Sequence, residues 1–416
     1  MLDINFIRQN PEKVKEGCKK KQVEVDIDKL LELDKKRREI LKELERLRHQ
    51  RNLISEKKTP TSEEINKARQ LKEKIKSLKE SLKSIEKDFK DLMFQVPNLP
   101  LPEVPVGKDE TENVVIRKVG NLPKFDFKIK DHLEIGESLD IIDVERAAKV
   151  AGTRFGYLKN EAVLLEFSLI KFAFDKLIKK GFRPILPPVM MKPVMMRGMG
   201  YIEQTDKEEA YYLPKDDLFL VGTAEQPIGA MHAGEIFEEE DLPRRYVGFS
   251  TCFRREAGSY GKDTKGIFRV HQFDKVEMFS FVKPEDSKKE HQFLLSVEEE
   301  LMKDLKIPYR VVSICTGDLG RPAAAKYDIE AWFPAQQKYR ETHSTSNCTD
   351  FQARRLNIRY REKSGKINFL HTLNGTAFAI GRTILAILEN YQRKDGKVNV
   401  PKVLQKYLGF KIIPAK

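Results

Sequence analysis

The chain has 416 residues, which is long enough for two domains and a large hydrophobic core. Lys and Arg number 77 against 64 Asp and Glu, so the formal net charge is +13. This excess favours a polyanionic partner such as nucleic acid, although 34% charged residues would also suit a surface built from ion pairs.

The cysteines and the apolar stretches exclude several other classes of protein. The four cysteines are scattered and form no CxxC pair, so we expect neither a zinc site nor a disulfide framework. The N-terminus lacks the basic and apolar regions of a signal peptide. The most apolar stretch, residues 162–174, is interrupted by Glu166 and Lys171 and is too short to span a bilayer. We therefore expect a cytoplasmic protein with no membrane partner.

Apolar residues in the first hundred positions follow the three–four spacing of a coiled coil. Two such runs cover residues 30–54 and 75–92. Between the runs, Pro60 cannot continue a helix, and Thr61 with Glu64 has the spacing of a capping box. The pattern predicts two long helices that fold back on each other as an antiparallel hairpin.

This hairpin should occupy about residues 28–93, with arms ~40–45 Å long at ~1.5 Å per residue. Its charges are mixed, with Lys and Arg in excess. They could form only the solvated face of a coiled coil, or they could lie along a phosphate backbone.

The prolines of residues 96–107 predict an extended linker and a domain boundary. Beyond it, short strand-like segments alternate with a few helices, of which the last is expected from Ala377 to Tyr391. The predicted fold class is α+β, with an antiparallel sheet flanked by helices. Neither a Walker A motif nor a GxGxxG sequence follows a strand, which argues against P-loop and Rossmann nucleotide sites.

The segment from Thr251 to Phe281 places charged residues on two strand-like runs joined by a glycine-rich loop, Gly258 to Gly266. Arg254 and Glu256 lie two apart and should share a strand face, as should Phe273 and Glu277, which lie four apart. Such charges are costly on a half-buried strand unless they are paired. They could be structural ion pairs, or they could bind a ligand with a flat base, phosphates and an amine or hydroxyl group.

Three other segments could carry chemistry. Thr223 and Glu225, where a strand leads into a helix, could grip a small polar ligand or merely cap the helix. Residues 340–350 are rich in carboxylate and hydroxyl oxygens and could hold Mg²⁺ or form a polar turn. Arg382 is the only charged residue between Ala377 and Leu388, so it must meet an anion such as phosphate or reach solvent.

These segments together resemble a known family. The Pro187-Pro188 strand, the Arg254-Arg255-Glu256 segment and the Gly375…Gly381-Arg382 helix resemble, in that order, motifs 1, 2 and 3 of class II aminoacyl-tRNA synthetases. Thr223-Ala224-Glu225, the segment from Glu341 to Arg355 and the N-terminal hairpin are similar to seryl-tRNA synthetases within that class. The resemblance covers essentially the whole chain.

The resemblance implies an architecture and a set of partners. Residues 1–100 would form a tRNA-binding domain with the long arm, and residues 101–416 would form an antiparallel class II catalytic domain. The enzyme would be a homodimer through the motif 1 region. The arm would bind the long variable arm of serine tRNA, and of selenocysteine tRNA as well.

The resemblance also implies the site. Adenine would stack on Phe273, while Arg254 and Arg382 would bind the α- and γ-phosphates of ATP. Other positions of the ATP site would be Arg255, Glu256, Val270, Thr342 and His343. Glu341 and Ser344 would contact ATP and hold Mg²⁺. Serine would be bound by Thr223, Ala224, Glu225, Glu277 and Thr376.

The implied reaction needs no nucleophile from the protein. The carboxylate of serine attacks the α-phosphorus of ATP, and the 3′-hydroxyl of tRNA then attacks the carbonyl of seryl-adenylate. Catalysis would rest on positioning and on stabilising phosphate charge. One alternative is a related ligase that loads a carrier protein, which would not need the arm. Another is a non-catalytic RNA-binding protein, which would not need to retain Arg254, Glu256, Glu341 and Arg382 together.

Overall fold

The computed structural model describes residues 1–203, 206–257 and 265–413, without the side chains of residues 206 and 207. The chain divides into two compact units, Met1–Pro97 and Asn98–Lys416, which are described separately.

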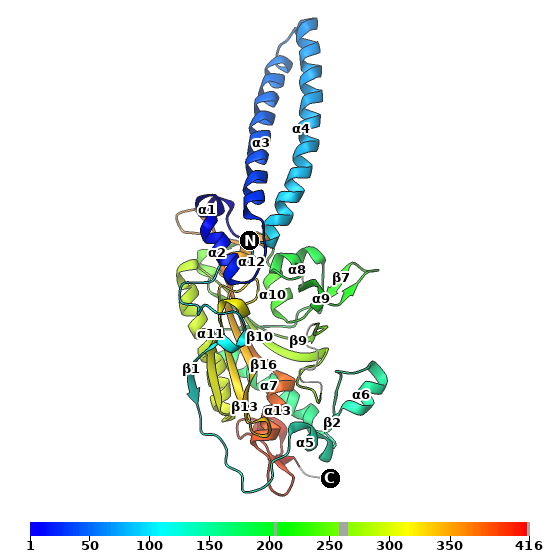
Figure 1. Ribbon diagram of the computed structural model, residues 1–416, viewed down its shortest axis with the longest axis vertical. Helices are drawn as coiled ribbons and strands as arrows, with labels where there is room; N and C mark the ends of the chain where they lie inside the picture. Colours follow the sequence, from blue (N-terminus) through cyan, green and yellow to red (C-terminus); the bar gives the residue numbers. More distant parts are fainter. Residues whose placement is uncertain (204–205, 258–264, 414–416) are drawn as a thin grey trace. The chain divides into compact units, whose positions relative to one another are not determined.

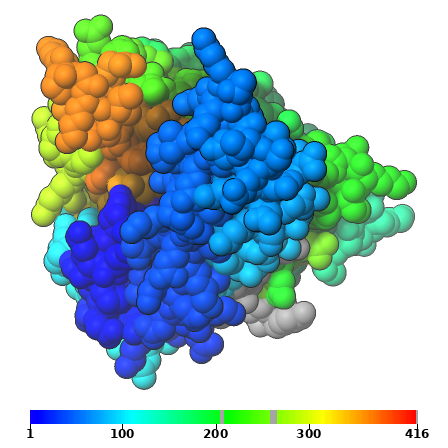
Figure 2. All heavy atoms as spheres, turned by 90° about the horizontal axis from the view of Figure 1, so that it is seen from above, coloured from blue at the N-terminus to red at the C-terminus, as the bar shows by residue number. Residues whose placement is uncertain are grey.

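The first unit contains the predicted hairpin (Figure 1). Its arms are α3, Ile27–Ser55, and α4, Ser62–Gln95, preceded by the short helices α1, Ile4–Gln9, and α2, Pro11–Lys20. With 29 and 34 residues, the arms are ~43 and ~51 Å long at ~1.5 Å per residue. Side chains of this unit form one continuous mass when viewed along the hairpin (blue in Figure 2).

Sequence signals for the hairpin are confirmed in detail. The Thr61 hydroxyl accepts a hydrogen bond from the Glu64 amide, and the Glu64 carboxylate accepts one from the Thr61 amide, so the capping box is complete. Between the arms the buried core consists of Leu44, Leu47, Leu71 and Ile75.

At the base of α3, the buried carboxylate of Asp34 is surrounded by arginines. Arg8 of α1 lies 3.1 Å from it and Arg38 lies 3.0 Å from it. Arg37 also faces Asp34 and covers the ring of Phe89 on α4. A buried carboxylate is tolerated only when it is paired in this way, so this cluster joins α1, α3 and α4.

The proline-rich segment contains the boundary between the two units and has no helix or strand from Pro97 to Gly107, as predicted, but it is docked against the rest of the second unit and is not a free linker. The Asn98 side chain donates hydrogen bonds to the carbonyls of Pro322 and Cys348, and the Leu101 amide donates to Ala324. Val104 is buried beside residues of the second unit. Prolines remove backbone donors, but the remaining donors and the apolar side chains still dock this segment.

Eight strands form the main sheet within the described part of the second unit. Their order is β1-β11-β12-β13-β16-β10-β9-β4, and every neighbouring pair is antiparallel except β4 with β9. The strands are β1 Val114–Val119, β11 Tyr309–Ser313, β12 Ala325–Phe333, β13 Lys338–Asn347, β16 His371–Ala379, β10 Gln272–Val282, β9 Arg244–Phe253 and β4 Arg183–Ile185.

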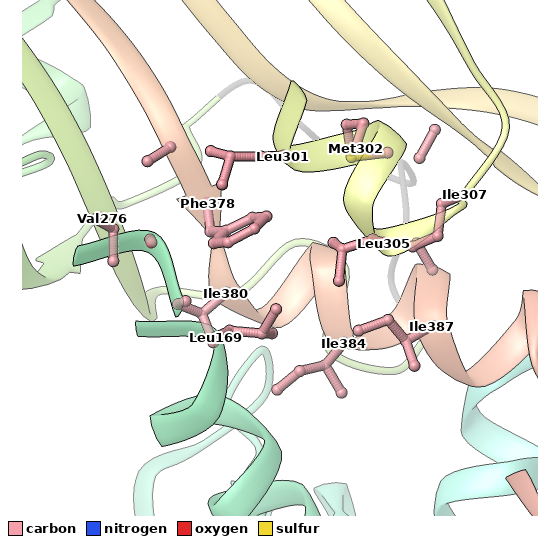
Figure 3. Close-up of a cluster of buried hydrophobic side chains, with 14 of the residues drawn as sticks. Leu169, Val276, Leu301, Met302, Leu305, Ile307, Phe378, Ile380, Ile384 and Ile387 are labelled. Atoms are coloured by element: carbon pink, nitrogen blue, oxygen red, sulfur yellow. The ribbon is translucent and has the colours of Figure 1, made fainter. Parts of the chain in front are cut away.

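Three long helices supply most of the apolar cover of this sheet. They are α7 Glu161–Lys179, α11 Ser287–Leu305 and α13 Ile380–Asn390. Figure 3 shows Leu301 and Leu305 of α11 meeting Phe378 of β16 and Ile384 of α13 in one cluster. This cluster fixes the positions of β16 and α13 relative to each other.

Shorter elements complete the unit. They are α5 His132–Ser138, β2 Ile142–Asp143, α6 Val144–Ala151, β3 Tyr157–Leu158, β5 Met190–Met191, α8 Pro193–Met199, α9 Asp206–Glu209, β6 Tyr212–Leu213, β7 Leu218–Leu220, α10 Glu225–Ala230, β8 Ile236–Glu238, α12 Phe351–Leu356, β14 Arg359–Arg361, β15 Ile367–Phe369, β17 Val398–Asn399, α14 Gln405–Leu408 and β18 Ile412–Ile413, with short 3₁₀ turns between some of them.

Two sequence-based assignments need correction. Residues 340–347, considered as a possible polar turn, lie in strand β13. The last helix begins at Ile380 rather than at Ala377, because residues up to Ala379 continue strand β16. Strands β13 and β16 contain many small polar residues and do not alternate apolar with polar side chains. They are buried because the helix layer covers them. Among the described residues, no helix is long and apolar enough to cross a membrane.

Candidate active site

A cavity of about 890 Å³ opens over the central strands of the second unit. Most of the site residues expected from the sequence line it: Thr223, Glu225, Arg254, Glu256, Val270, Phe273, Glu341, Thr342, Ser344, Thr376 and Arg382. Ala224, Arg255, Glu277 and His343 are not among its lining residues.

A bulge in β13 determines which of its residues face the cavity. Glu341 pairs with Glu330 of β12, and His343 pairs with the next residue, Ile329, so Thr342 is the extra residue. The Thr342 hydroxyl donates to the carbonyl of Ile329 at this irregularity. Glu341 and Ser344 are three apart and would face opposite sides of a regular strand, but the bulge brings them to one side.

The same bulge turns His343 away from the cavity. Its ring is buried against Phe378 in the apolar cluster, and burial lowers its pKa to about 3. A place for the His343 side chain in the ATP site is therefore incorrect, because it faces the other side of the sheet.

A second bulge, in the neighbouring strand β16, positions Thr376. Thr376 pairs with Glu277 of β10, whereas Phe378 pairs with the next residue, Val276, which leaves Ala377 as the extra residue. Thr376, which lines the cavity, therefore points to the same side of the sheet as Glu277, and Phe378 faces the helix layer with Val276. Bulges of this kind re-aim side chains and are frequent beside active sites.

Arg254 and Glu256 do not share a strand face, because β9 ends at Phe253 and Glu256 has a left-handed φ of 53°. Both residues nevertheless reach the cavity. Arg254 covers the ring of Phe273 with its guanidinium carbon 5.2 Å from the centroid, and Glu256 pairs with Arg269. An arginine held against an aromatic face presents its N–H groups to the cavity edge.

Arg255 points elsewhere. Its guanidinium lies over the ring of Tyr211, 5.1 Å from the centroid, in a shallower hollow beside the main cavity. The expectation that it lines the ATP site is not met.

The Arg382 side chain contacts a carboxylate and an aromatic ring of the protein. Its Nη1 lies 3.2 Å from the Glu341 carboxylate, and its guanidinium carbon lies 4.8 Å from the centroid of Phe268. Burial raises the pKa of Glu341, but the positive charges of Arg382, Lys326 and Arg254 outweigh that effect and lower it to about 2. The Glu341 side chain is 47% exposed, so solvent screens part of this attraction, and the carboxylate is ionised at neutral pH.

Another group of charges surrounds Thr223. Its hydroxyl donates to the Glu277 carboxylate over 3.2 Å, and the Lys275 ammonium contacts both residues. Glu225 accepts hydrogen bonds from Tyr201 and Gln352. Ala224 is buried before α10 and contributes no side chain to this group.

Glu225 has an unusual protonation equilibrium. Burial and the nearby charge of Glu277 raise its pKa to about 7, against the opposing effects of Lys275, Gln352 and Tyr201. The site therefore holds one carboxylate paired with a lysine and one that is poised to ionise near neutrality. Such a combination suits a ligand with an ammonium and a hydroxyl group.

Several participating residues were not found from the sequence. Lys275 and Lys326 line the cavity, as do the aromatic ring of Phe268 and the guanidinium-bearing Arg269. Lys275 could have been found from the sequence, because Lys275 and Glu277 flank an apolar residue in a strand-like run. The Gly258–Gly266 loop, expected near the end of the tRNA, lies outside the described residues except for its last two positions.

Comparison with known proteins decides the family. The family model described as seryl-tRNA synthetase N-terminal domain matches residues 1–100, and the one described as tRNA synthetase class II core domain (G, H, P, S and T) matches residues 211–391. A serine–tRNA ligase of Dictyoglomus thermophilum is 48% identical, with all of both chains covered. The chain belongs to the seryl-tRNA synthetase family.

Solved structures agree with this assignment. The crystal structure of seryl-tRNA synthetase from Pyrococcus horikoshii complexed with ATP is 46% identical over 100% of both chains, with a TM-score of 0.93. The serine–tRNA ligase of Naegleria fowleri in complex with AMP is 38% identical, covers 100% of this chain and 99% of its own, and gives a TM-score of 0.89. The fold is therefore the class II synthetase fold, as predicted.

Proposed function

We propose that this chain is a serine–tRNA ligase, which activates L-serine with ATP and transfers the seryl group to the 3′ end of tRNA. The observation that carries the proposal is that one cavity combines an arginine-rich half with a compact cluster of carboxylates and a hydroxyl. The first half suits a polyphosphate, and the second suits the ammonium and hydroxyl of serine.

In the first step, the serine carboxylate attacks the α-phosphorus of ATP and pyrophosphate leaves. Arg254 binds the α-phosphate, where negative charge is shared between the entering and leaving oxygens, and Phe273 stacks on adenine. Arg382 binds the γ-phosphate. Glu256 and Val270 border the adenine, and no protein nucleophile is required.

Serine is held by the cluster around Thr223. Glu225 and Thr223 receive the ammonium group, while Glu277 and Thr376 bind the hydroxyl group. Alanine would leave these buried groups unpaired, so it should be rejected strongly.

Glu341 and Ser344 have the donor types that Mg²⁺ prefers, and they face the same side of β13. Next to them, Asp328 is buried and its Oδ1 has no hydrogen-bond partner among the described residues. An unpaired buried carboxylate oxygen is a suitable acceptor for a water molecule bound to the metal, so this set of residues fits Mg²⁺. When bound, Mg²⁺ would neutralise phosphate charge.

The hairpin binds tRNA in this proposal. Lysines and arginines along α3 and α4 can follow the phosphate backbone of the long variable arm of serine tRNA, and selenocysteine tRNA is a second substrate of the same shape.

The protein acts as a homodimer in the cytoplasm. On α7, Leu164 and Phe167 are exposed, and nearby in the chain Leu186 is 77% exposed. Leu164 and Phe167 are three apart on α7 and so share a helix face, and contiguous exposed apolar patches commonly mark protein interfaces.

Serine-dependent exchange of pyrophosphate into ATP tests the proposal. Exchange with serine, but not with alanine or threonine, together with charging of a tRNA that has a long variable arm, is the expected result. Absence of exchange with serine would refute it.

A further inference from the structure

Glu298 of α11 is a fully buried carboxyl group with no assigned role. Its side chain is 0% exposed, and neither carboxyl oxygen lies within hydrogen-bonding geometry of a donor among the described residues. Burial raises its pKa well above the ordinary value, and the charges of Glu277 and Asp328 add to this effect. Both effects favour the protonated, neutral form of the group.

Glu298 lies directly beneath the bulged part of β16. A Cβ placed on Gly375 would come within 3.0 Å of its Oε1, so the glycine allows this close approach. The backbone N–H of Thr376 is near enough to oppose the rise in the Glu298 pKa. The carboxyl thus faces the backbone whose other side presents Thr376 to the cavity.

The bulge explains why a backbone N–H of β16 needs a hydrogen-bond acceptor such as the Glu298 carboxyl. Because Ala377 is an extra residue, the regular pairing of β16 with β10 is interrupted between Thr376 and Phe378. Backbone groups at an interruption need another partner, and an unpaired buried N–H is costly. Hydrogen bonds at such sites are often long before the substrate binds and shorten in the complex.

We propose that Glu298 is a positioning residue for the amino-acid subsite, where it accepts the Thr376 N–H and thereby fixes the Thr376 hydroxyl opposite Glu277. This inference rests on the proposed function. Glu298 itself touches no substrate, and it acts on the recognition of serine and not on ATP.

Packing is the competing explanation, and two substitutions separate it from positioning. Glu298→Gln keeps a neutral acceptor of the same shape, whereas Glu298→Met keeps much of the volume but has no oxygen. In the full-length protein, we expect Glu298→Met to raise the KM for serine in pyrophosphate exchange about tenfold, with the KM for ATP within about twofold. Discrimination against alanine should fall, and Glu298→Gln should restore both values to within about threefold of the original.

Glu299 provides the matched control, because it is the next residue of α11, is also buried, and pairs with Arg117 and Tyr309. Glu299→Met should lower the melting temperature without changing the KM for serine selectively. The proposal is overturned if Glu298→Met leaves the KM for serine unchanged, or if the KM values for serine and ATP rise together as they would in a loosened fold. A wild-type protein without serine-dependent exchange would instead refute the proposed function.

Discussion

Arg382 is held in place before any phosphate arrives. Its contacts with Glu341 and Phe268 come from different elements, so the guanidinium has little freedom to lose on binding. The arginine fork can then bind two phosphate oxygens at once, which a lysine cannot do.

Replacing Arg382 by alanine should therefore lower kcat/KM for ATP in pyrophosphate exchange by about 100-fold, since a charge-assisted hydrogen bond contributes ~1.5–3 kcal/mol and more than one is lost. Arg382→Lys should recover only part of this loss. Arg361, an exposed residue of β14, provides a control in Arg361→Ala, which should have no effect. Exchange within about threefold of wild type in Arg382→Ala would contradict the assigned role.

Glu225 should make serine binding depend on pH. Its pKa is about 7, so only about a tenth of the protein has this carboxylate ionised at pH 6. If the ammonium of serine binds the ionised form, kcat/KM for serine should rise about tenfold from pH 6 to pH 8, and Glu225→Gln should remove the rise. A Glu225→Gln variant that keeps the full pH profile would exclude Glu225 as its source.

The same group should affect the free energy of unfolding. The folded-state pKa lies above the unfolded value of ~4.3, so its favourable contribution is complete below that value and is lost as pH rises through about 7. Glu225→Gln should therefore be more stable relative to wild type at pH 8 than at pH 5, as measured by thermal unfolding.

At the scale of helices and strands, the features predicted correctly from the sequence are those that depend on residues close together in the chain. The two arms, the Thr61 capping box and the strand-to-helix transition at Glu225 are confirmed, because each depends on residues within a few positions. Most of the site residues that the resemblance implied line the cavity. The bulges at Thr342 and Ala377 were not predictable, since each depends on pairing with a partner strand. The first of them turns His343, which the resemblance placed in the ATP site, to the other side of the sheet.

The hairpin has a small core, so single apolar residues in it should matter greatly. Leu47 of α3 is fully buried between the arms, whereas Leu53 of the same helix is about half exposed. Leu47→Ala should destabilise the hairpin by ~2–5 kcal/mol, and Leu53→Ala by much less. Hydrogen exchange of the α3 and α4 amides would show the difference, and equal protection in the two variants would contradict this description.

At the scale of the whole molecule, activation and charging should be separable. Replacing residues 30–92 by a short flexible linker removes the arm but leaves every residue of the cavity. Pyrophosphate exchange should continue at a rate close to wild type, while charging of tRNA should be lost. Loss of both activities to the same extent, in a protein that remains folded, would count against the proposed role of the arm.

The proposed dimer can be tested on α7. Phe167 is 63% exposed, and glutamate at this position would place a charge in an apolar interface. Phe167→Glu should sediment as a monomer under conditions where the wild-type protein is a dimer. Ile65→Glu, at an exposed position of α4, should remain dimeric. A monomeric wild-type protein would refute the interface.

Each of the two bulges holds one residue that strand pairing itself does not need. Deletion of Thr342 would give a regular strand in which Glu341 and Ser344, then two positions apart, still face the same side. After loss of Ala377, Thr376 would likewise still pair with Glu277 and Phe378 with Val276. Only the local bend and twist of the strand would be lost, so a one-residue gap at Thr342 or Ala377 is expected to be tolerated better than a gap elsewhere in these two strands, which would exchange the faces of site residues.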